Sequence, residues 1–284
     1  MPNVRWEKRI NNNITMKKLI IIICLFITAI QAQAQCAIEN TAFKSGESLT
    51  YDLEFNWKFI WYKVGTASMN TIGSVYNGAE VFRTKLISKT SHKADFFFIM
   101  RDTLTSIYTK ELIPLYFRKG AEEGKRYTID EAWFSYQGGK SIINQRRTYR
   151  DGSVSITKQI YDDCVYDMLS ILARARSFDS SDLNKLQKIH FPMTTGKNIE
   201  EQTLLYRGKK NFTSNDKRTY RCLVFSLVEY EKNKEKEIIT FYITDDKNHL
   251  PVRLDMYLRF GSAKAFLTSI RGNRYPLSSI ISGK

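Results

Sequence analysis

Along most of the chain, apolar and polar residues alternate with a period of two, which is typical of half-buried β-strands. In residues 48–56 the odd positions are apolar and the even positions are polar. Turn sequences such as Gln137-Gly138-Gly139 and Asp151-Gly152 separate many of the segments at hairpin spacing. Further strands are expected at residues 63–71, 81–90, 102–110, 115–120, 125–136, 141–150, 153–160, 188–193, 200–206, 218–228, 237–244, 252–259 and 263–271.

One segment, residues 161–178, has the spacing of an amphipathic helix instead. Its main apolar positions are Val165, Met168, Leu169, Leu172 and Ala173. Asp162 and Asp163 stand where capping side chains would accept the amide hydrogens of a first turn. The residues left over form a narrow polar stripe: Asp163, Asp167, Ser170, Arg174 and Ser177. We expect the helix to be covered on most sides, with the stripe facing water or a cavity.

Many consecutive hairpins and a single internal helix define the fold class. A long run of strands has to curl in order to bury its apolar face and limit its edges. The pattern therefore predicts a mainly β protein, with a strongly curved antiparallel sheet or half-open β-barrel and the helix of about residues 161–178 packed into its concave side. A sandwich of two sheets is the alternative.

The first residues of the chain differ from the rest. Lys17 and Lys18 precede an apolar run at residues 19–30, and small residues follow at Ala32 and Ala34. This is the pattern of a secretory signal peptide with cleavage before Gln35. Residues 1–34 are thus predicted to be an upstream extension and a cleaved leader, whether translation starts at Met1 or Met16. Residues 35–284 are predicted to form one exported β-rich domain, periplasmic or secreted.

Three cysteines remain after the predicted cleavage: Cys36, Cys164 and Cys222. Cys36 invites an outer-membrane lipoprotein interpretation, which we disfavour because Gln35 stands where lipoprotein processing needs a small residue. Cys164 and Cys222 would be able to form a disulfide in an oxidising compartment. Both also suit small buried apolar positions, so the sequence leaves their state open.

The formal net charge of the chain is +15, and residues 1–34 contribute five Lys/Arg and one Glu, so the mature chain would carry a charge near +11. A basic exported protein favours anionic lipid head groups or acidic glycans, or uses diffuse charge for solubility. The basic residues follow no nucleic-acid-binding motif, and an exported chain rarely meets nucleic acid. We expect no nucleic-acid partner and at most peripheral membrane contact.

Short sequence pieces spread over the chain carry a family resemblance. They include Leu49-Thr50-Tyr51, residues 61–67 (WYKVGTA), residues 165–170 (VYDMLS), Tyr206-Arg207-Gly208, Thr244-Asp245-Asp246, Leu250-Pro251-Val252 and residues 261–265 (GSAKA). In this order they resemble the bacterial envelope family called domain of unknown function 3108. The resemblance implies an exported, β-rich domain and implies no chemistry.

The sequence offers no catalytic, metal or cofactor motif. His92, His190 and His249 lie far apart, without the spacing of a metal-binding pair. The acidic pairs at residues 162–163 and 245–246 suit a helix cap and a turn better than a cation site or an acid–base pair. We therefore expect no catalytic residues, no metal and no cofactor.

Aromatic side chains and the polar stripe are the candidate binding residues. In a curved sheet, aromatics such as Trp57 and Trp61 would line a pocket whose polar end is formed by Asp167, Ser170 and Arg174. This predicts a non-catalytic envelope protein that binds a lipid-like or glycan ligand in its concave face. The competing hypotheses are a hydrolase of envelope polymers that uses Asp or Glu, and a structural or assembly partner of another envelope protein. In the stripe, an internal ion pair is the competing interpretation.

Overall fold

The computed structural model describes residues 36–57, 60–95, 98–179, 181, 183–215, 217–232, 234–258 and 261–282. The predicted extension and leader, residues 1–34, and the predicted mature terminus at Gln35 lie outside the described residues. Within the described part, no helix is long and apolar enough to cross a membrane.

In the described part of the chain, sixteen strands form one large, almost entirely antiparallel sheet. The first half consists of β1 (Glu47–Trp57), β2 (Ile60–Tyr76), β3 (Ala79–Thr90), β4 (Met100–Thr109), β5 (Pro114–Glu123), β6 (Arg126–Gln137), β7 (Lys140–Tyr149) and β8 (Val154–Tyr161). The second half consists of β9 (Tyr166–Asp167), β10 (Lys188–Thr194), β11 (Ile199–Thr213), β12 (Thr219–Glu231), β13 (Lys234–Thr244), β14 (Pro251–Leu258), β15 (Gly261–Arg271) and β16 (Ile280–Ser282).

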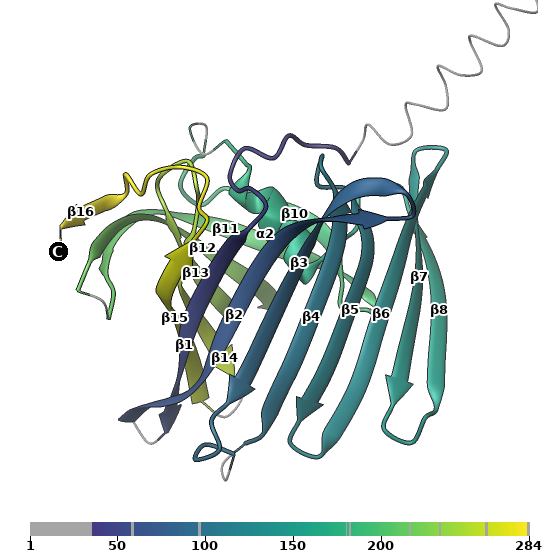
Figure 1. The fold of residues 1–284 in the computed structure, drawn as a ribbon, viewed down its shortest axis with the longest axis horizontal. Helices are drawn as coiled ribbons and strands as arrows, with labels where there is room; N and C mark the ends of the chain where they lie inside the picture. Colours follow the sequence, from purple (N-terminus) through teal and green to yellow (C-terminus); the bar gives the residue numbers. More distant parts are fainter. Residues whose placement is uncertain are drawn as a thin grey trace, which may run out of the picture.

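The two halves join where β1 pairs with β15, so that Leu53 lies opposite Ala265. From there the strands follow one another as hairpins outward to β8 on one side and to β10 on the other, and β9 pairs in parallel with the outer edge of β10. The sheet curls around its concave face (Figure 1). Within the described residues no ladder joins β8 to β9 or β10, so the sheet is not closed. Thr194 Oγ1 donates to Gln145 Oε1 over 2.6 Å and links β10 to β7.

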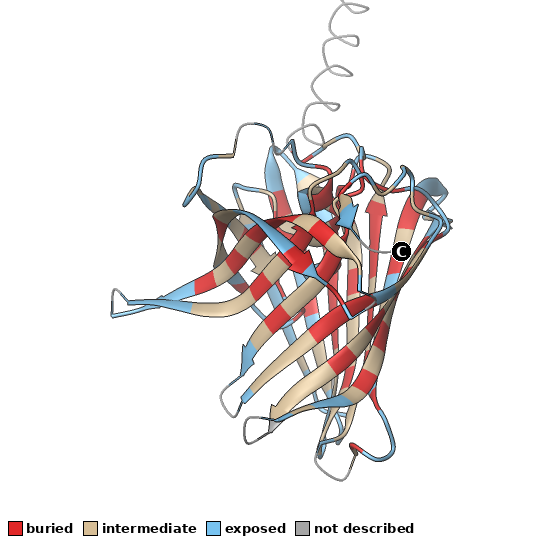
Figure 2. Cartoon of the chain, turned by 90° about the vertical axis from the view of Figure 1, so that its left-hand side faces the viewer, coloured by how far each residue is buried: buried red, intermediate tan, exposed pale blue. Residues whose placement is uncertain are grey.

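The alternation predicted from the sequence decides which side chains face inward. In β1, Leu49, Tyr51 and Leu53 are buried, and the polar residues between them are partly exposed. Buried and more exposed positions alternate in the same way along other strands (Figure 2). The inward positions join one large hydrophobic core that spans both halves of the sheet. The predicted fold class is therefore confirmed as a mainly β, strongly curved antiparallel sheet with a short helix.

The helix α2 (Met168–Arg176) is shorter than the predicted 161–178. Residues 154–161 stay in β8 because they pair with β7, and Tyr166-Asp167 forms β9 beside Met193 and Thr194. The prediction that Asp162 and Asp163 cap the helix was wrong. Asp167 is the N-cap, because its Oδ1 accepts hydrogen bonds from the amides of Leu169 and Ser170 at 2.9 and 3.1 Å.

The helix packs on the concave side of the sheet, as predicted, against β4, β9 and β10 (Figure 1). Leu169 and Ala173 are buried, and Leu172 packs against the core with part of its surface exposed. The apolar face that was read from helical spacing therefore covers the inside of the curved sheet.

A disulfide joins Cys36 to Cys164, with 5.5 Å between their Cα atoms. The alternative that Cys164 pairs with Cys222 is wrong, because Cys222 is a free, fully buried thiol in the core. Cys164 lies on the connection between β8 and β9, and the segment that begins at Cys36 reaches it there. In this disulfide form the Cys36 sulfur has no valence left for the thioether-linked lipid of a lipoprotein.

Candidate functional site

The concave side of the sheet and the helix enclose a cavity of about 1540 Å³. Apolar side chains from both halves of the sheet and from α2 form most of its wall. They include Leu53, Met69, Leu86, Met100, Leu104, Leu169, Leu172, Leu204, Leu223, Phe225, Leu227, Ile239, Phe241, Leu254, Met256 and Ala265. An apolar cavity of this kind favours the binding of hydrophobic groups that would otherwise be exposed to water.

The wall follows from the period of two in the strands. On β3, Leu86, Ser88 and Thr90 line the cavity, while Ile87 between them does not. On β14, Leu254, Met256 and Leu258 line it, while Tyr257 does not. Successive side chains of a strand point to opposite faces, so every second residue of these strands faces the cavity.

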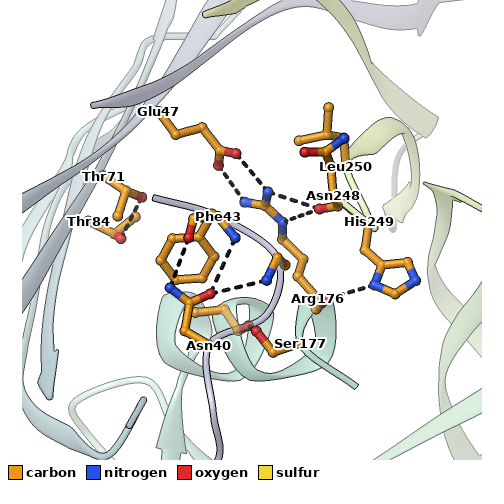
Figure 3. A network of polar contacts seen from close by, with 12 residues as sticks. Asn40, Phe43, Glu47, Thr71, Thr84, Arg176, Ser177, Asn248, His249 and Leu250 are labelled. Atoms are coloured by element: carbon orange, nitrogen blue, oxygen red, sulfur yellow. Dashed lines mark hydrogen bonds and ion pairs between the residues drawn. The ribbon is translucent and has the colours of Figure 1, made fainter. Parts of the chain in front are cut away.

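A buried ion pair lies beside the cavity at the C-terminal end of α2 (Figure 3). Arg176 Nη1 and Nη2 donate to Glu47 Oε1 and Oε2 at 2.6 and 2.8 Å, and both side chains are almost fully buried. Nε of the same arginine donates to the carbonyl oxygen of Asn248 over 3.2 Å. The pair thereby fixes the end of the helix to the start of β1 and to the turn between β13 and β14.

That turn is held by several further polar contacts. Asn248 Nδ2 donates to the carbonyl oxygen of Tyr275 over 3.0 Å, and the amide of Tyr275 donates back to Asn248 Oδ1 over 2.9 Å. His249, which has a left-handed φ of 44°, places Nδ1 2.6 Å from the carbonyl oxygen of Arg176 and lines the cavity. Paired polar groups therefore hold the C-terminal end of α2 against the sheet.

Exposed side chains among the lining residues show where the cavity reaches the surface. Tyr62, Phe98 and Leu258 lie at the turns of three hairpins and are 51%, 43% and 44% exposed. Beside the helix, Met168 and Phe178 are also lining residues and are partly exposed. The cavity thus opens at the hairpin end of the sheet and along one flank of α2.

The structure separates the residues of the predicted polar stripe. Asp167 and Ser170 are fully buried in the helix cap and are not among the lining residues. Ser106 Oγ donates to Asp167 Oδ2 over 2.8 Å, and the amide of Asp167 donates to Ser170 Oγ over 2.9 Å. Burial raises the pKa of the Asp167 carboxyl, and the hydrogen bonds it receives from Ser170, Ser106 and the amide of Leu169 oppose the rise. Their evident role is to start the helix.

Arg174 is the stripe residue that lines the cavity. Its Nη1 donates to the carbonyl oxygen of Cys36 over 2.9 Å, and its guanidinium lies 5.4 Å from the ring centre of Tyr166. It is partly exposed, in contrast to Arg176 two residues later. Arg174 and Asp167 therefore do not form the internal ion pair considered for the stripe, and the buried ion pair of the helix joins Arg176, which lies outside the stripe, to Glu47.

The two tryptophans chosen from the sequence are placed differently. The side chain of Trp57 lies outside the described residues. Trp61 is half-buried on β2 and is not among the lining residues, but Lys264, whose Nζ lies 3.9 Å from the centre of the Trp61 ring, is. Phe225 and Phe241, which were not among the predicted site residues, line the cavity instead. Their alternating positions within strands were the signal that could have found them.

Acidic and histidine side chains are dispersed over the wall. Glu54, Asp163 and Glu201 line the cavity from three separate elements, and no cluster of the described His, Cys, Asp and Glu residues is suited to hold a metal ion. His190 and His249 also belong to the lining, and Nδ1 of His190 lies 3.1 Å from Thr203 Oγ1. Burial holds the pKa of the lining Tyr51 well above its usual range, so its hydroxyl remains protonated.

Asp102 is a buried carboxylate on β4, between the lining residues Met100 and Leu104. Burial raises its pKa from 3.8 to about 6, although Lys119 Nζ lies 3.8 Å from its Oδ2. Between those two pH values the folded state binds more protons than the unfolded state, so the free energy of unfolding falls as the pH rises through this window.

The variant Asp102→Asn cannot ionise and should lack this dependence. We expect it to gain roughly 1–2 kcal/mol relative to the natural chain between pH 4 and pH 7, after allowance for the solvent near the group. Urea unfolding at a series of pH values measures the difference. Parallel curves for the two proteins from pH 4 to pH 7 would show that Asp102 titrates normally.

Two kinds of comparison relate the chain to known proteins. The model of the family described as "Protein of unknown function (DUF3108)" matches residues 50–268. This span includes almost every strand that builds the cavity. No curated protein matches the chain.

Among solved structures, the chain is similar to a crystal structure of a β-barrel-like protein of the domain of unknown function DUF1849 from Brucella abortus. The TM-score is 0.53 at 9% sequence identity, over 85% of this chain and 100% of that one. A second match, named "putative lipoprotein" from Parabacteroides distasonis, has a TM-score of 0.32 at 9% identity and covers 83% of this chain and 99% of that one. The first match shows a shared barrel-like fold, and the second is too distant to support an argument.

Proposed function

The chain belongs to the DUF3108 family of proteins of unknown function, and we propose that it is a non-catalytic carrier of a lipid-like molecule. The observation that supports the proposal is the cavity of about 1540 Å³ in the concave face of the sheet. Typical small-molecule pockets measure about 300–1,000 Å³. The cavity therefore has room for a ligand with long apolar chains.

The composition of the wall favours a lipid over a glycan. A sugar presents hydroxyl groups on most of its surface, and each one buried without a partner costs free energy. Leu, Ile, Met and Phe side chains dominate the wall of this cavity and offer no such partners. An acyl chain or another hydrocarbon gains by leaving water for the same surroundings.

Arg174 is the best-placed group for the polar end of an amphiphile. Its guanidinium lies beside the cavity and, among the described residues, has a hydrogen-bonded partner only at Nη1. Nε and Nη2 therefore have donors left for the oxygens of a carboxylate or phosphate. In this arrangement the apolar chains fill the space under the helix and the anionic head group lies against Arg174.

The proposal includes the cellular compartment in which the protein acts. The disulfide between Cys36 and Cys164 indicates an extracytoplasmic protein, because disulfides persist in oxidising compartments. Together with the leader-like pattern at residues 17–34, it supports export to the periplasm or beyond. An exported carrier would meet the lipids of the bacterial envelope.

Filling the cavity should abolish binding. We expect the double variant Leu86→Trp with Met256→Trp to weaken binding of a fluorescent long-chain fatty acid at least about tenfold, because both side chains project into the apolar space. The matched control is Ile87→Trp with Tyr257→Trp, at the neighbouring positions on the same strands that do not line the cavity. Fluorescence titration of the purified proteins compares them.

The control variant should bind like the natural chain. If both double variants retain the affinity of the natural chain, the fatty acid binds elsewhere and the cavity is not its site. If the natural chain binds no fatty acid, lysophospholipid or monoacylglycerol, the proposed function is wrong.

The role of Arg174 is tested by the charge of the ligand. Arg174→Gln removes a charge-assisted contact worth about 1.5–3 kcal/mol, so affinity for a fatty acid should fall about tenfold or more. Affinity for the uncharged monoacylglycerol of the same chain length should change little, and the melting temperature should stay nearly constant. An equal loss for both ligands would mean that Arg174 shapes the cavity instead of contacting a head group.

A further inference from the structure

Three neighbouring hairpins end side by side at the open end of the cavity. Strand pairing places Asn56 opposite Ser262, Gly65 opposite Thr90 and Leu258 opposite Gly261. The turns β1–β2, β3–β4 and β14–β15 therefore lie at the same end of adjacent strands, far from α2 in the view of Figure 1. The β5–β6 turn joins them, because the amide of Gly124 donates to the carbonyl oxygen of Ile99 over 2.8 Å.

Large apolar side chains are exposed on these turns. Ile60 and Tyr62 are 55% and 51% exposed, Phe98 is 43% exposed, and Tyr257 and Leu258 are 46% and 44% exposed. Three of the five, namely Tyr62, Phe98 and Leu258, also line the cavity. The apolar wall thus continues out of the cavity onto the tips of the hairpins, which is unusual for a surface that faces only water.

Basic side chains surround this apolar rim. Those exposed on or beside the four turns are Lys63, whose Nζ lies 2.7 Å from Asp52 Oδ2, and the four residues Lys89, Lys93, Lys125 and Arg126. The nearby acidic residues are less exposed, and Asp95, Glu122 and Glu123 are engaged by Arg101, Arg150 and Lys119. The rim therefore presents an excess of positive charge to its surroundings.

From the apolar tips, the basic surroundings and the continuity with the cavity, we infer that the hairpin end docks on a membrane surface that carries anionic lipids. Tyr, Phe and Leu side chains insert at the boundary of head groups and acyl chains, and Lys and Arg are attracted to anionic head groups. In the docked state, the mouth of the cavity faces the bilayer, and an amphiphile passes between them without crossing water. This inference rests on the proposed function.

The test is flotation of the purified protein with vesicles of phosphatidylcholine, with or without phosphatidylglycerol. We expect binding to the vesicles that contain phosphatidylglycerol, weakened by added salt. Tyr62→Ser with Phe98→Ser should reduce that binding about tenfold, because two side chains lose their insertion. The matched control is Ile72→Ser with Val75→Ser, which are also exposed and lie on β2 away from the cavity.

A charge-reversal variant of the rim and its matched control separate electrostatic attraction from insertion of apolar side chains. Lys93→Glu with Lys125→Glu should abolish the preference for phosphatidylglycerol, whereas Lys85→Glu with Lys158→Glu, exposed on the middle of β3 and β8, should leave it intact. Equal effects of rim and control variants would overturn the inference, as would a natural chain that floats with neither kind of vesicle.

These outcomes are independent of ligand binding. The cavity-filling double variant Leu86→Trp with Met256→Trp leaves the rim residues unchanged, so it should still bind vesicles. If the natural chain binds the fluorescent fatty acid but no vesicles, the docking inference fails and the proposed function stands. If it binds vesicles but no amphiphile in solution, the proposed function fails and with it the transfer step.

Discussion

Replacing Arg176 by methionine should lower the free energy of unfolding by about 3–5 kcal/mol, because it leaves the Glu47 carboxylate buried without its cation. In the structure both side chains of the pair are almost fully buried, and Arg176 donates to both carboxylate oxygens and to the carbonyl oxygen of Asn248 (Figure 3). The loss should also loosen the junction of α2, β1 and the β13–β14 turn. Urea unfolding of the two proteins measures the difference.

Two further variants define what this loss means. Lys236→Met breaks an ion pair with Glu231 in which the side chains are 53% and 67% exposed, and it should cost less than about 1 kcal/mol. Adding Glu47→Leu to Arg176→Met removes the stranded carboxylate and should restore much of the stability. A single variant Arg176→Met as stable as the natural chain would show that water reaches Glu47 and that the helix end is not sealed.

Removing the disulfide should have an effect of similar size. Cys36 and Cys164 are 128 residues apart, and constraining a loop of that length in the unfolded chain is worth about 4–5 kcal/mol in the chain-entropy model. The bond also ties the segment that begins at Cys36 to the connection in front of α2, where Arg174 binds the carbonyl oxygen of Cys36. We therefore expect Cys36→Ser with Cys164→Ser to unfold at a much lower urea concentration.

Cys222 supplies an internal standard for that experiment. Burial raises the pKa of its thiol to about 12, so it should react with a thiol reagent only after unfolding. A chain that begins at Gln35 should then show one reactive thiol in denaturant without reductant and three with reductant. Three thiols before reduction would contradict the disulfide and the extracytoplasmic compartment inferred from it.

The strands were largely predictable because their signal is local. The alternation in residues 48–56 and the glycines of turns such as 138–139 and 152 depend only on neighbouring residues, and the structure places strands and turns there. The start of the helix is not determined by the local sequence. Residues 161–167 have helical spacing, but Tyr161 pairs with β7 and Tyr166-Asp167 pairs with β10, and these distant partners decide their conformation.

The candidate site was only partly predictable for the same reason. A cavity on the concave face and the position of Arg174 beside it followed from the patterns. The capping role of Asp167 and Ser170 depends on where the helix begins. The pairing of Arg176 with Glu47 joins residues that are 129 positions apart in the sequence. Spacing along the chain carries no information on such pairs, nor on the pairing of Cys36 with Cys164 instead of Cys222.

The fold alone does not identify the ligand. The similar structure from Brucella abortus shares the architecture at 9% identity, so the residues that line the two interiors are free to differ. In the proposed function, the ligand is recognised by the apolar wall, by Arg174 and by the residues at the mouth of the cavity.

Native mass spectrometry of the protein purified from its own cell envelope without detergent tests most directly whether the cavity holds a lipid-like ligand. We expect the mass of the mature chain plus a lipid, released as a free amphiphile on activation, and loss of that adduct in the double variant Leu86→Trp with Met256→Trp. The bare polypeptide mass for the natural chain, in repeated detergent-free preparations, would contradict the claim that the cavity holds a lipid-like ligand.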